Sequence, residues 1–284
     1  MKFREKLSTS GIVYKVLLFL LILAPLILQG QSRLYNAVVS DNQSRVNRFL
    51  SRGDDPNGDG NPQYIPIIGA AEGNLHRMVV ILLEAKADIN IQNHIGFTAL
   101  MEATIQRHNR IMNLLISNDA NLELRATNGA TALMIAVNAA NLRGARFLLE
   151  AGANSNVTDA DGITPLMRAV QTGNNVEMVK LLVEYDADVN ARTPDGTPLI
   201  MLYPYRNRIL THHEVINLGA DVNVQDEDGK TPLIKAVIEN NMEMIKLLIE
   251  NGADRFIADS NGLSANDYGL ALMEVREYFE TLDE

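Results

Sequence analysis

Residues 161–190 read DGITPLMRAVQTGNNVEMVKLLVEYDADVN, and they contain the signals for one complete structural unit. The Asp-Gly pair at its start favours a tight turn with a positive φ at the glycine. Thr164 is suited to cap a helix, and Pro165 fits the first helical position, where no amide hydrogen is needed. The first half of the stretch therefore predicts a turn and a short helix, whose alanine lets a neighbouring segment approach closely.

The second half of the same stretch predicts another helix after a turn at residues 172–174. Its apolar residues Val176, Val179, Leu181 and Leu182 have the spacing of a helix with one buried face. Glycine or an equivalent residue in a left-handed conformation is expected to end this helix. The unit is therefore a turn followed by two helices.

This unit recurs along the chain with a period of 33 residues, and recurrence at a fixed period is the sequence signature of a repeat protein. A small residue followed by Asp or Asn marks each copy, and the steps between marks are 33, 33, 33, 34, 33 and 33. The marks are Asp54 (in Gly53-Asp54), Ala87, Ala120, Ala153, Ala187, Ala220 and Ala253. The turn glycines are Gly96, Gly129, Gly162, Gly196, Gly229 and Gly262, and Thr-Ala-Leu or Thr-Pro-Leu follows at Thr98, Thr131, Thr164, Thr197 and Thr231.

The repeated pattern resembles the ankyrin repeat over roughly residues 31–282. The resemblance implies an all-α repeat solenoid, an ankyrin-type stack of hairpin-helix-turn-helix units with terminal caps. It implies a single domain of about seven repeats plus a C-terminal capping repeat, with hairpin tips and first helices on the concave side. One such unit cannot bury its apolar face alone, so stability comes from the interfaces between neighbours.

Methionine replaces the histidine that this family usually has after Thr-Pro-Leu. The positions are Met101, Met134, Met167 and Met201, with Ile234 in the next copy. A methionine in every repeat could form a ladder of metal ligands, but these positions face the seam between repeats, where methionine is a flexible filler. We therefore predict that they pack in the core.

Repeat six, residues 197–223, departs from the others. Bulky residues stand where the first helices of the other repeats have small alanines, and Pro204 falls where the first helix should finish. Its second helix, predicted from Arg208 to Leu218, is one residue shorter than in the other repeats. The repeat is either a degenerate spacer or a binding feature.

Residues 1–30 have the organisation of a secretory signal peptide. Met1–Lys15 is basic, and Val16–Leu28 is an unbroken apolar run. As a helix this run would be roughly 20 Å long, against about 30 Å of hydrocarbon in a bilayer. Small residues then fit cleavage after Gly30 or Ser32. The alternative is an inner-membrane anchor made by residues 16–28, and only then would the membrane be a partner.

Composition restricts the function further. The net charge is −10, and residues 1–30 contribute +3 of it, which leaves −13 for the remainder. Such an acidic surface repels phosphate, so nucleic acid is not expected as a partner. The chain has no cysteine, which excludes thiolate metal sites and cysteine nucleophiles.

No motif for catalysis, a metal or a cofactor is present in the sequence. The nearest candidate is the pair His212-His213, and neighbours on a helix point about 100° apart. We interpret the pair as a surface pair, and we predict a chain that is not an enzyme and has no cofactor or metal.

The resemblance places variable binding residues at the hairpin tips and at the ends of the first helices. They are His94, Ile95, Phe97, Ile105 and Gln106 in repeat three; Thr127, Asn128, Ala130 and Asn138 in repeat four; Asp161, Ile163 and Gln171 in repeat five; Tyr205 in repeat six; and Asp228, Lys230 and Glu239 in repeat seven. Ile95, Phe97 and Ile105 would form a hot spot if they converge. Otherwise they are scattered exposed apolar residues, which are common.

We therefore expect a monomeric protein-binding module that acts in the periplasm or extracellular space through its concave face and hairpin tips. Signal-bearing ankyrin proteins are commoner in bacteria, so the resemblance favours a bacterial, exported type. The alternative is a membrane-anchored periplasmic scaffold that retains residues 16–28.

Overall fold

The computed structural model describes residues 32–172, 176–202 and 209–283. The predicted signal segment, residues 1–30, lies outside the described residues. The chain divides into two compact units between His94 and Ile95. Where the structure describes the chain, it is helical and has no strand; two isolated bridges join Arg192 to Pro198 and Ala258 to Ser264. The all-α expectation is confirmed.

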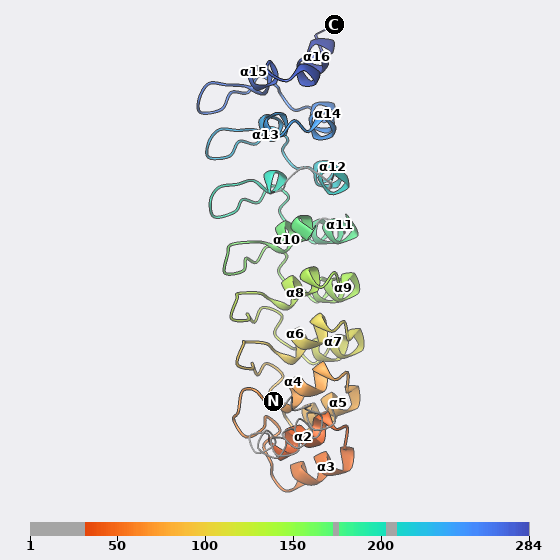
Figure 1. Ribbon diagram of the computed structural model, residues 1–284. Coiled ribbons are helices and arrows are strands. Elements are labelled where there is room, and N and C mark those ends of the chain that lie inside the picture. The colour runs from red at the N-terminus through yellow and green to blue at the C-terminus, as the bar shows by residue number, and fades with distance from the viewer. Residues whose placement is uncertain (1–31, 173–175, 203–208, 284) are drawn as a thin grey trace, which may run out of the picture. The chain divides into compact units, whose positions relative to one another are not determined.

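The part of the first unit that the structure describes, residues 32–94, contains two helix pairs (Figure 1). They are α2 (Arg33–Val39) with α3 (Gln43–Ser51), and α4 (Pro66–Glu72) with α5 (His76–Glu84). Helix α2 packs on both α3 and α4, and α4 packs on α5. Leu34, Ile67 and Leu82 are fully buried between these helices.

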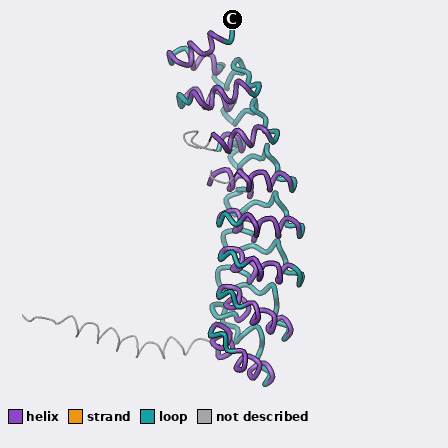
Figure 2. Tube along the Cα trace, turned by 90° about the vertical axis from the view of Figure 1, so that its right-hand side faces the viewer, coloured by secondary structure: helices purple, strands orange, loops and turns teal. Residues whose placement is uncertain are grey.

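The second unit repeats the same pairing. Its first helices are α6 (Ala99–Ile105), α8 (Ala132–Asn138), α10 (Pro165–Thr172), the 3₁₀ helix η1 (Leu199–Met201), α13 (Pro232–Ile238) and α15 (Ala265–Gly269). Its second helices are α7 (Asn109–Ile116), α9 (Leu142–Glu150), α11 (Val176–Glu184), α12 (Ile209–Asn217), α14 (Met242–Glu250) and α16 (Met273–Thr281). Within this unit the second helices lie one above another, and the hairpin loops extend on the opposite side of the first helices (Figures 1 and 2).

The predicted caps and stops explain where these helices begin and end. The hydroxyls of Thr98, Thr131 and Thr231 accept hydrogen bonds from the backbone amide three residues on. The hydroxyl of Thr164 likewise accepts a hydrogen bond from the backbone amide of Met167, at 3.2 Å. One left-handed residue follows the second helix of each repeat, at Gly53, Lys86, Asp119, Gly152, Asp186, Gly219 and Gly252. The threonine cap read from one repeat therefore holds in repeats three, four, five and seven, and the left-handed stop holds at all seven positions.

The methionine ladder is part of the core. Met101, Met134, Met167 and Met201 are each at most 5% exposed, and Ile234 is fully buried. First helices of successive repeats pack directly on one another, α6 on α8 and α8 on α10. The packing interpretation of the methionines is confirmed.

A side chain links each repeat to the next at one fixed position. In the second unit Glu123, Asn156, Asn190 and Asn223 each accept a hydrogen bond from a backbone amide 31 or 32 residues later, at 2.8–2.9 Å. The three asparagines also donate to a carbonyl that follows the next repeat's second helix, at 2.7–3.5 Å. At the equivalent position after Asn223 stands Phe256, which is 62% exposed. We call these contacts the forward links.

Repeat six corrects two expectations. Thr197 does not cap an α-helix there, because Pro198 precedes a three-residue 3₁₀ helix instead. Its second helix, α12, has nine residues, the same length as α11 and α14, so the prediction of a shortened helix was wrong. Residues 203–208, with Pro204 and Tyr205, lie outside the described residues.

None of the helices that the structure describes has the length and apolar character needed to span a bilayer.

Candidate protein-binding surface

An aspartate organises several hairpins of the second unit. One carboxylate oxygen of Asp159 accepts the amides of Asp161 (3.0 Å) and Ile163 (2.9 Å), and the other accepts from Arg168 Nη2 at 2.7 Å. Asp226 does the same with the amides of Asp228 and Lys230 and with Lys235 Nζ. Asp259 repeats it with Asn261, Leu263 and the Tyr268 hydroxyl. These hairpins are therefore fixed before any partner binds.

Backbone hydrogen bonds also join neighbouring tips. Thr127 N donates to Ile95 O (3.0 Å), Ala160 N to Asn128 O (3.1 Å), and Ser260 N to Asp228 O (2.9 Å). Pro194 occupies the matching position in repeat six and has no amide hydrogen to donate. The tips of repeats three to five thus form one connected row.

Side chains between the hairpins reinforce this row. Arg125 donates to Gly129 O (3.1 Å) and to Thr158 O, and Arg192 donates to Gly196 O (2.8 Å) and Gln225 O (2.9 Å). Gln225 bridges Gly229 O and Ala258 O in the same way. Each of these residues holds its own hairpin and the next one together, so the tips form a rigid display.

The structure places most of the predicted residues on the exterior of their units. His94 is exposed in the first unit. In the second unit Ile95, Ile105, Gln106, Thr127, Asn128, Asn138, Asp161, Asp228 and Glu239 are exposed, and Phe97, Ile163, Gln171 and Lys230 are half-buried. Ala130 is the exception, being 5% exposed, because its small side chain turns inward where its carbonyl closes the hairpin to Ala126. Tyr205 lies outside the described residues.

The apolar residues of repeat three occupy two positions. Ile95 is 40% exposed at the hairpin tip, and Ile105 is 44% exposed as the last residue of α6. A seven-residue helix rises roughly 10 Å, so α6 separates the two side chains. They are two contact points on one face, and the predicted convergence does not extend from Ile95 to Ile105.

Sequence reasoning missed two exposed residues on this face. Ile238, the last residue of α13, is 51% exposed and is the repeat-seven equivalent of Ile105. Asp195 is exposed at the tip of repeat six. Both could have been found from the repeat register. Ile105 plus three steps of 33 and one of 34 gives Ile238, whereas the prediction chose Glu239, one residue later. Asp161 plus one step of 34 gives Asp195.

The charges at the tips are held by hydrogen bonds. Lys230 Nζ donates to Asp228 at 2.8 Å, which lowers the pKa of the carboxyl and raises the pKa of the ammonium. The Thr193 hydroxyl donates to Asp195 and lowers the pKa of that carboxyl. Burial pushes the pKa of Asp259 upward, but hydrogen bonds from Tyr268, Leu263 and Asn261 outweigh it, so the pKa is lowered. These aspartates therefore present negative charge at neutral pH.

The histidine pair is not a surface pair. His213 is exposed, but His212 is 1% exposed in α12. Neighbouring residues on a helix point about 100° apart, so one ring enters the core while the other faces solvent. In the part of the chain that the structure describes, no group of three or more His, Asp or Glu residues is arranged to hold a metal.

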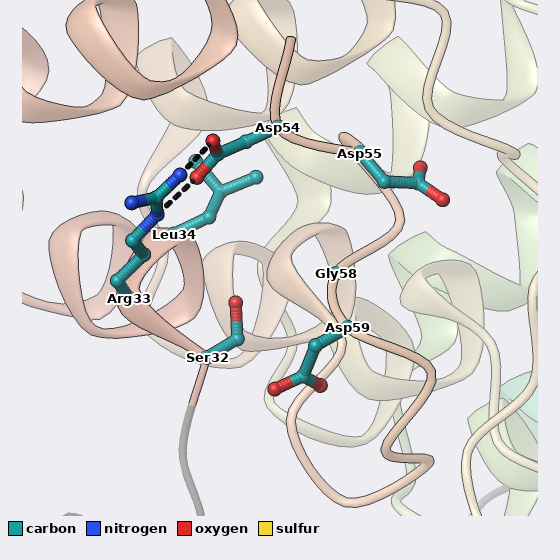
Figure 3. Close-up of a pocket in the computed structure, with 7 residues that line it drawn as sticks. All are labelled: Ser32, Arg33, Leu34, Asp54, Asp55, Gly58 and Asp59. Atoms are coloured by element: carbon teal, nitrogen blue, oxygen red, sulfur yellow. Dashed lines mark hydrogen bonds and ion pairs between the residues drawn. The ribbon is translucent and has the colours of Figure 1, made fainter. Parts of the chain in front are cut away.

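A pocket in the first unit is lined by acidic residues (Figure 3). Its volume is about 370 Å³, and its lining consists of Ser32, Arg33, Leu34, Asp54, Asp55, Gly58 and Asp59. Arg33 binds both oxygens of Asp54, with Nε at 2.7 Å from Oδ2, which lowers the pKa of Asp54. Asp55 and Asp59 each accept the amide two residues on. The carboxylates are thus engaged in shaping the loop.

The second unit is therefore a helical repeat protein whose hairpin tips display side chains in a fixed row. The sequence matches the family model described as ankyrin repeats (3 copies) at residues 34–126, 109–193 and 206–274. The chain belongs to the ankyrin repeat family. The fold of this family is a non-catalytic interaction scaffold, and ankyrin repeats generally mediate protein–protein interaction.

Solved structures agree with this assignment. The ankyrin repeat domain of Bcl-3, titled a unique member of the IkappaB protein family, is 22% identical, with a TM-score of 0.67 over 87% of this chain and 99% of that chain. The human ASB11 ankyrin repeat domain is 24% identical (TM-score 0.59; 72% and 90% covered). An ankyrin repeat domain from Acinetobacter baumannii AYE is 27% identical (TM-score 0.61; 66% and 98% covered). No curated protein matches the sequence.

Proposed function

We propose that the chain binds a partner protein through the hairpin tips and first helices of the second unit, and that it acts in a bacterial periplasm or outside the cell. One observation carries the binding surface: the tips are fixed by repeated hydrogen bonds, yet Ile95, Asn128 and Asp161 remain exposed. A row ordered in advance loses little conformational entropy on binding. The partner would contact several repeats together.

The test of this surface is affinity capture from the native compartment with Phe97→Asp as the variant. Phe97 is half-buried on the tip of repeat three, so the charge is expected to weaken capture about tenfold or more with little change in melting temperature. Phe256→Asp is the matched control, because Phe256 is exposed and lies outside the proposed surface. Equal losses of capture and melting temperature in Phe97→Asp would place Phe97 in the core and contradict the proposal.

Export rests on the sequence of residues 1–30, which combines a basic start, a 13-residue apolar run and small residues near Gly30. N-terminal sequencing of the purified protein tests it. A start at Gln31 or Arg33 supports a free periplasmic or secreted protein. Retention of residues 16–28 would favour the second candidate, a scaffold anchored in the inner membrane by its uncleaved apolar segment.

A further inference from the structure

The first half of the second unit has a stretch of arginines without acidic neighbours in sequence. No Asp or Glu occurs between Glu102 and Asp119, or between Glu123 and Glu150, in a chain whose net charge is −10. These two intervals contain Arg107, Arg110, Arg125, Arg143 and Arg146, and residues 87–179 contain no lysine. Positive charge is thus concentrated here, and it is carried by arginine alone.

Three of these arginines lie where the first helices turn into the second helices. Arg110 is the second residue of α7 and Arg143 the second residue of α9, and both are exposed. The two helices pack side by side, which implies an axis separation of 8–10 Å. Arg107 lies in the turn before α7 in a left-handed conformation, and its guanidinium donates to Ala139 O in the next turn. Side chains from adjacent repeats therefore form one edge.

Helix electrostatics favours the opposite charge at these positions. The equivalent second residues of α11, α14 and α16 are Glu177, Glu243 and Glu274, whereas α5 in the first unit has Arg77. The amino end of a helix carries a partial positive charge, so a glutamate there is stabilising and an arginine is destabilising. Helix stability alone therefore does not account for Arg110 and Arg143, and a residue that breaks a local rule of the fold is a candidate for function.

Two features leave this edge able to bind a partner. None of the ion pairs in the described ranges involves Arg110, and Arg143 stacks over Phe147 at 5.4 Å from the ring centroid. Ile105, 44% exposed, ends α6 two residues before Arg107. Guanidinium groups bind carboxylates with two parallel hydrogen bonds, which the ammonium of lysine cannot match.

We propose that Ile105, Arg107, Arg110 and Arg143, the arginine edge, bind an acidic segment of a partner protein that carries an apolar side chain beside its carboxylates. Charge complementarity selects this occupant: the edge is cationic and adjoins one exposed isoleucine. The inference goes beyond the function proposed above, because three of its four residues lie outside the hairpin tips and the ends of the first helices.

The experiment measures binding of the full chain to a fluorescent synthetic peptide in which glutamates alternate with leucines. R110E/R143E is expected to weaken binding by about tenfold to a hundredfold, since two charge-assisted contacts are lost. Its melting temperature should stay the same or rise, because glutamate suits both helix starts. R110Q/R143Q, which removes the charge without reversing it, should weaken binding severalfold, and added salt should weaken binding to the unmodified protein.

The control K246E/R276E makes the same change in net charge on α14 and α16, and it should leave peptide binding unchanged. Phe97→Asp should also bind the peptide normally, so a failure of the tip surface can be told apart from a failure of the arginine edge. The proposal is overturned if K246E/R276E weakens binding as much as R110E/R143E, or if a lysine-leucine peptide binds equally well. Binding to anionic lipid vesicles with no binding to the peptide would also overturn it.

Discussion

Repeat five and repeat six both begin their first helices with Thr-Pro-Leu, followed by Met in repeat five and by Ile-Met in repeat six, but the helices that form are different. In repeat five, α10 begins at Pro165 and continues for eight residues, whereas repeat six forms only the three-residue η1. Their hairpins differ as well. Asp159 closes the first by accepting two amides and Arg168, while Thr193 closes the second by exchanging hydrogen bonds with Thr197.

The difference separates the signal that starts a helix from the residues that continue it. Both repeats keep a buried methionine at the seam, Met167 and Met201. In repeat five Arg168 follows the methionine, and the next two residues, Ala169 and Val170, are buried. In repeat six Leu202 follows the methionine, and the next two residues of the sequence, Tyr203 and Pro204, lie outside the described residues. A start signal therefore fixes the turn, whereas a bulky residue and a proline in the positions that follow oppose continuation of a closely packed helix.

The largest effect is expected at the seam of the regular repeat. Met167→Asp places a carboxylate at a position that is fully buried, and it should lower the free energy of unfolding by about 3 kcal/mol or more. Met167→Leu conserves volume and should cost less than about 1.5 kcal/mol. Urea unfolding followed by circular dichroism measures both. If the aspartate is tolerated as well as the leucine, the seam is not the source of stability.

A smaller effect is expected where repeats five and six touch. Gly162 has φ +74°, and a Cβ added there would lie 2.7 Å from Pro194 Cδ. Gly162→Ala should therefore cost about 2 kcal/mol, through backbone strain and steric overlap. Gly252→Ala is the matched control, with φ +87° and no atom within 4 Å of the added Cβ, and it should cost about 1 kcal/mol.

Comparison of thermal melts would separate strain from overlap. In the double variant G162A/P194A the overlap is removed, so its cost should fall to that of Gly252→Ala. A cost that does not fall would mean that the proline ring is not the obstacle.

The smallest effect concerns pH and the hairpin of repeat six. The Thr193 hydroxyl lowers the pKa of Asp195 below its ordinary value of 3.8. The folded state then binds fewer protons than the unfolded state, so this contribution is complete above pH 3.8 and is lost as the pH falls through the lower, folded pKa. Asp195→Asn should make the melting temperature fall less steeply in that acid range. An unchanged slope would show that the hydrogen bond has no effect on stability.

Much of this architecture was predictable because the same sequence signals recur in successive repeats. The structure confirms the threonine caps of repeats three, four, five and seven, and it confirms that the methionines of repeats three to six are buried. The turn glycines recur at the same spacing and have a positive φ. Repeat six could not be predicted in this way, because its helix depends on packing against neighbours and not on its Thr-Pro signal. His212 was misassigned because a helical position next to an exposed residue can face the core.

The binding surface was harder to predict than the fold. Register identified which positions are exposed, such as Ile105 and Asp161, but not which of them a partner contacts. Arg110 and Arg143 could not be singled out from the sequence, because an arginine on a helix is ordinary until its position at the helix start is known. That position becomes informative only when compared with Glu177 and Glu243 in the later repeats.

The forward links have a consequence for how such an array can lengthen or shorten. The donor in each link is a backbone amide, which almost any residue supplies, and the specific acceptor is always carried by the preceding repeat, as in Asn190 and Asn223. A duplicated or deleted period of 33 residues upstream of Phe256 leaves every acceptor facing an amide. A copy inserted directly after the Phe256 repeat would find no acceptor. Gene duplication and protein engineering can therefore edit the interior of this array in whole repeats without designing a new junction.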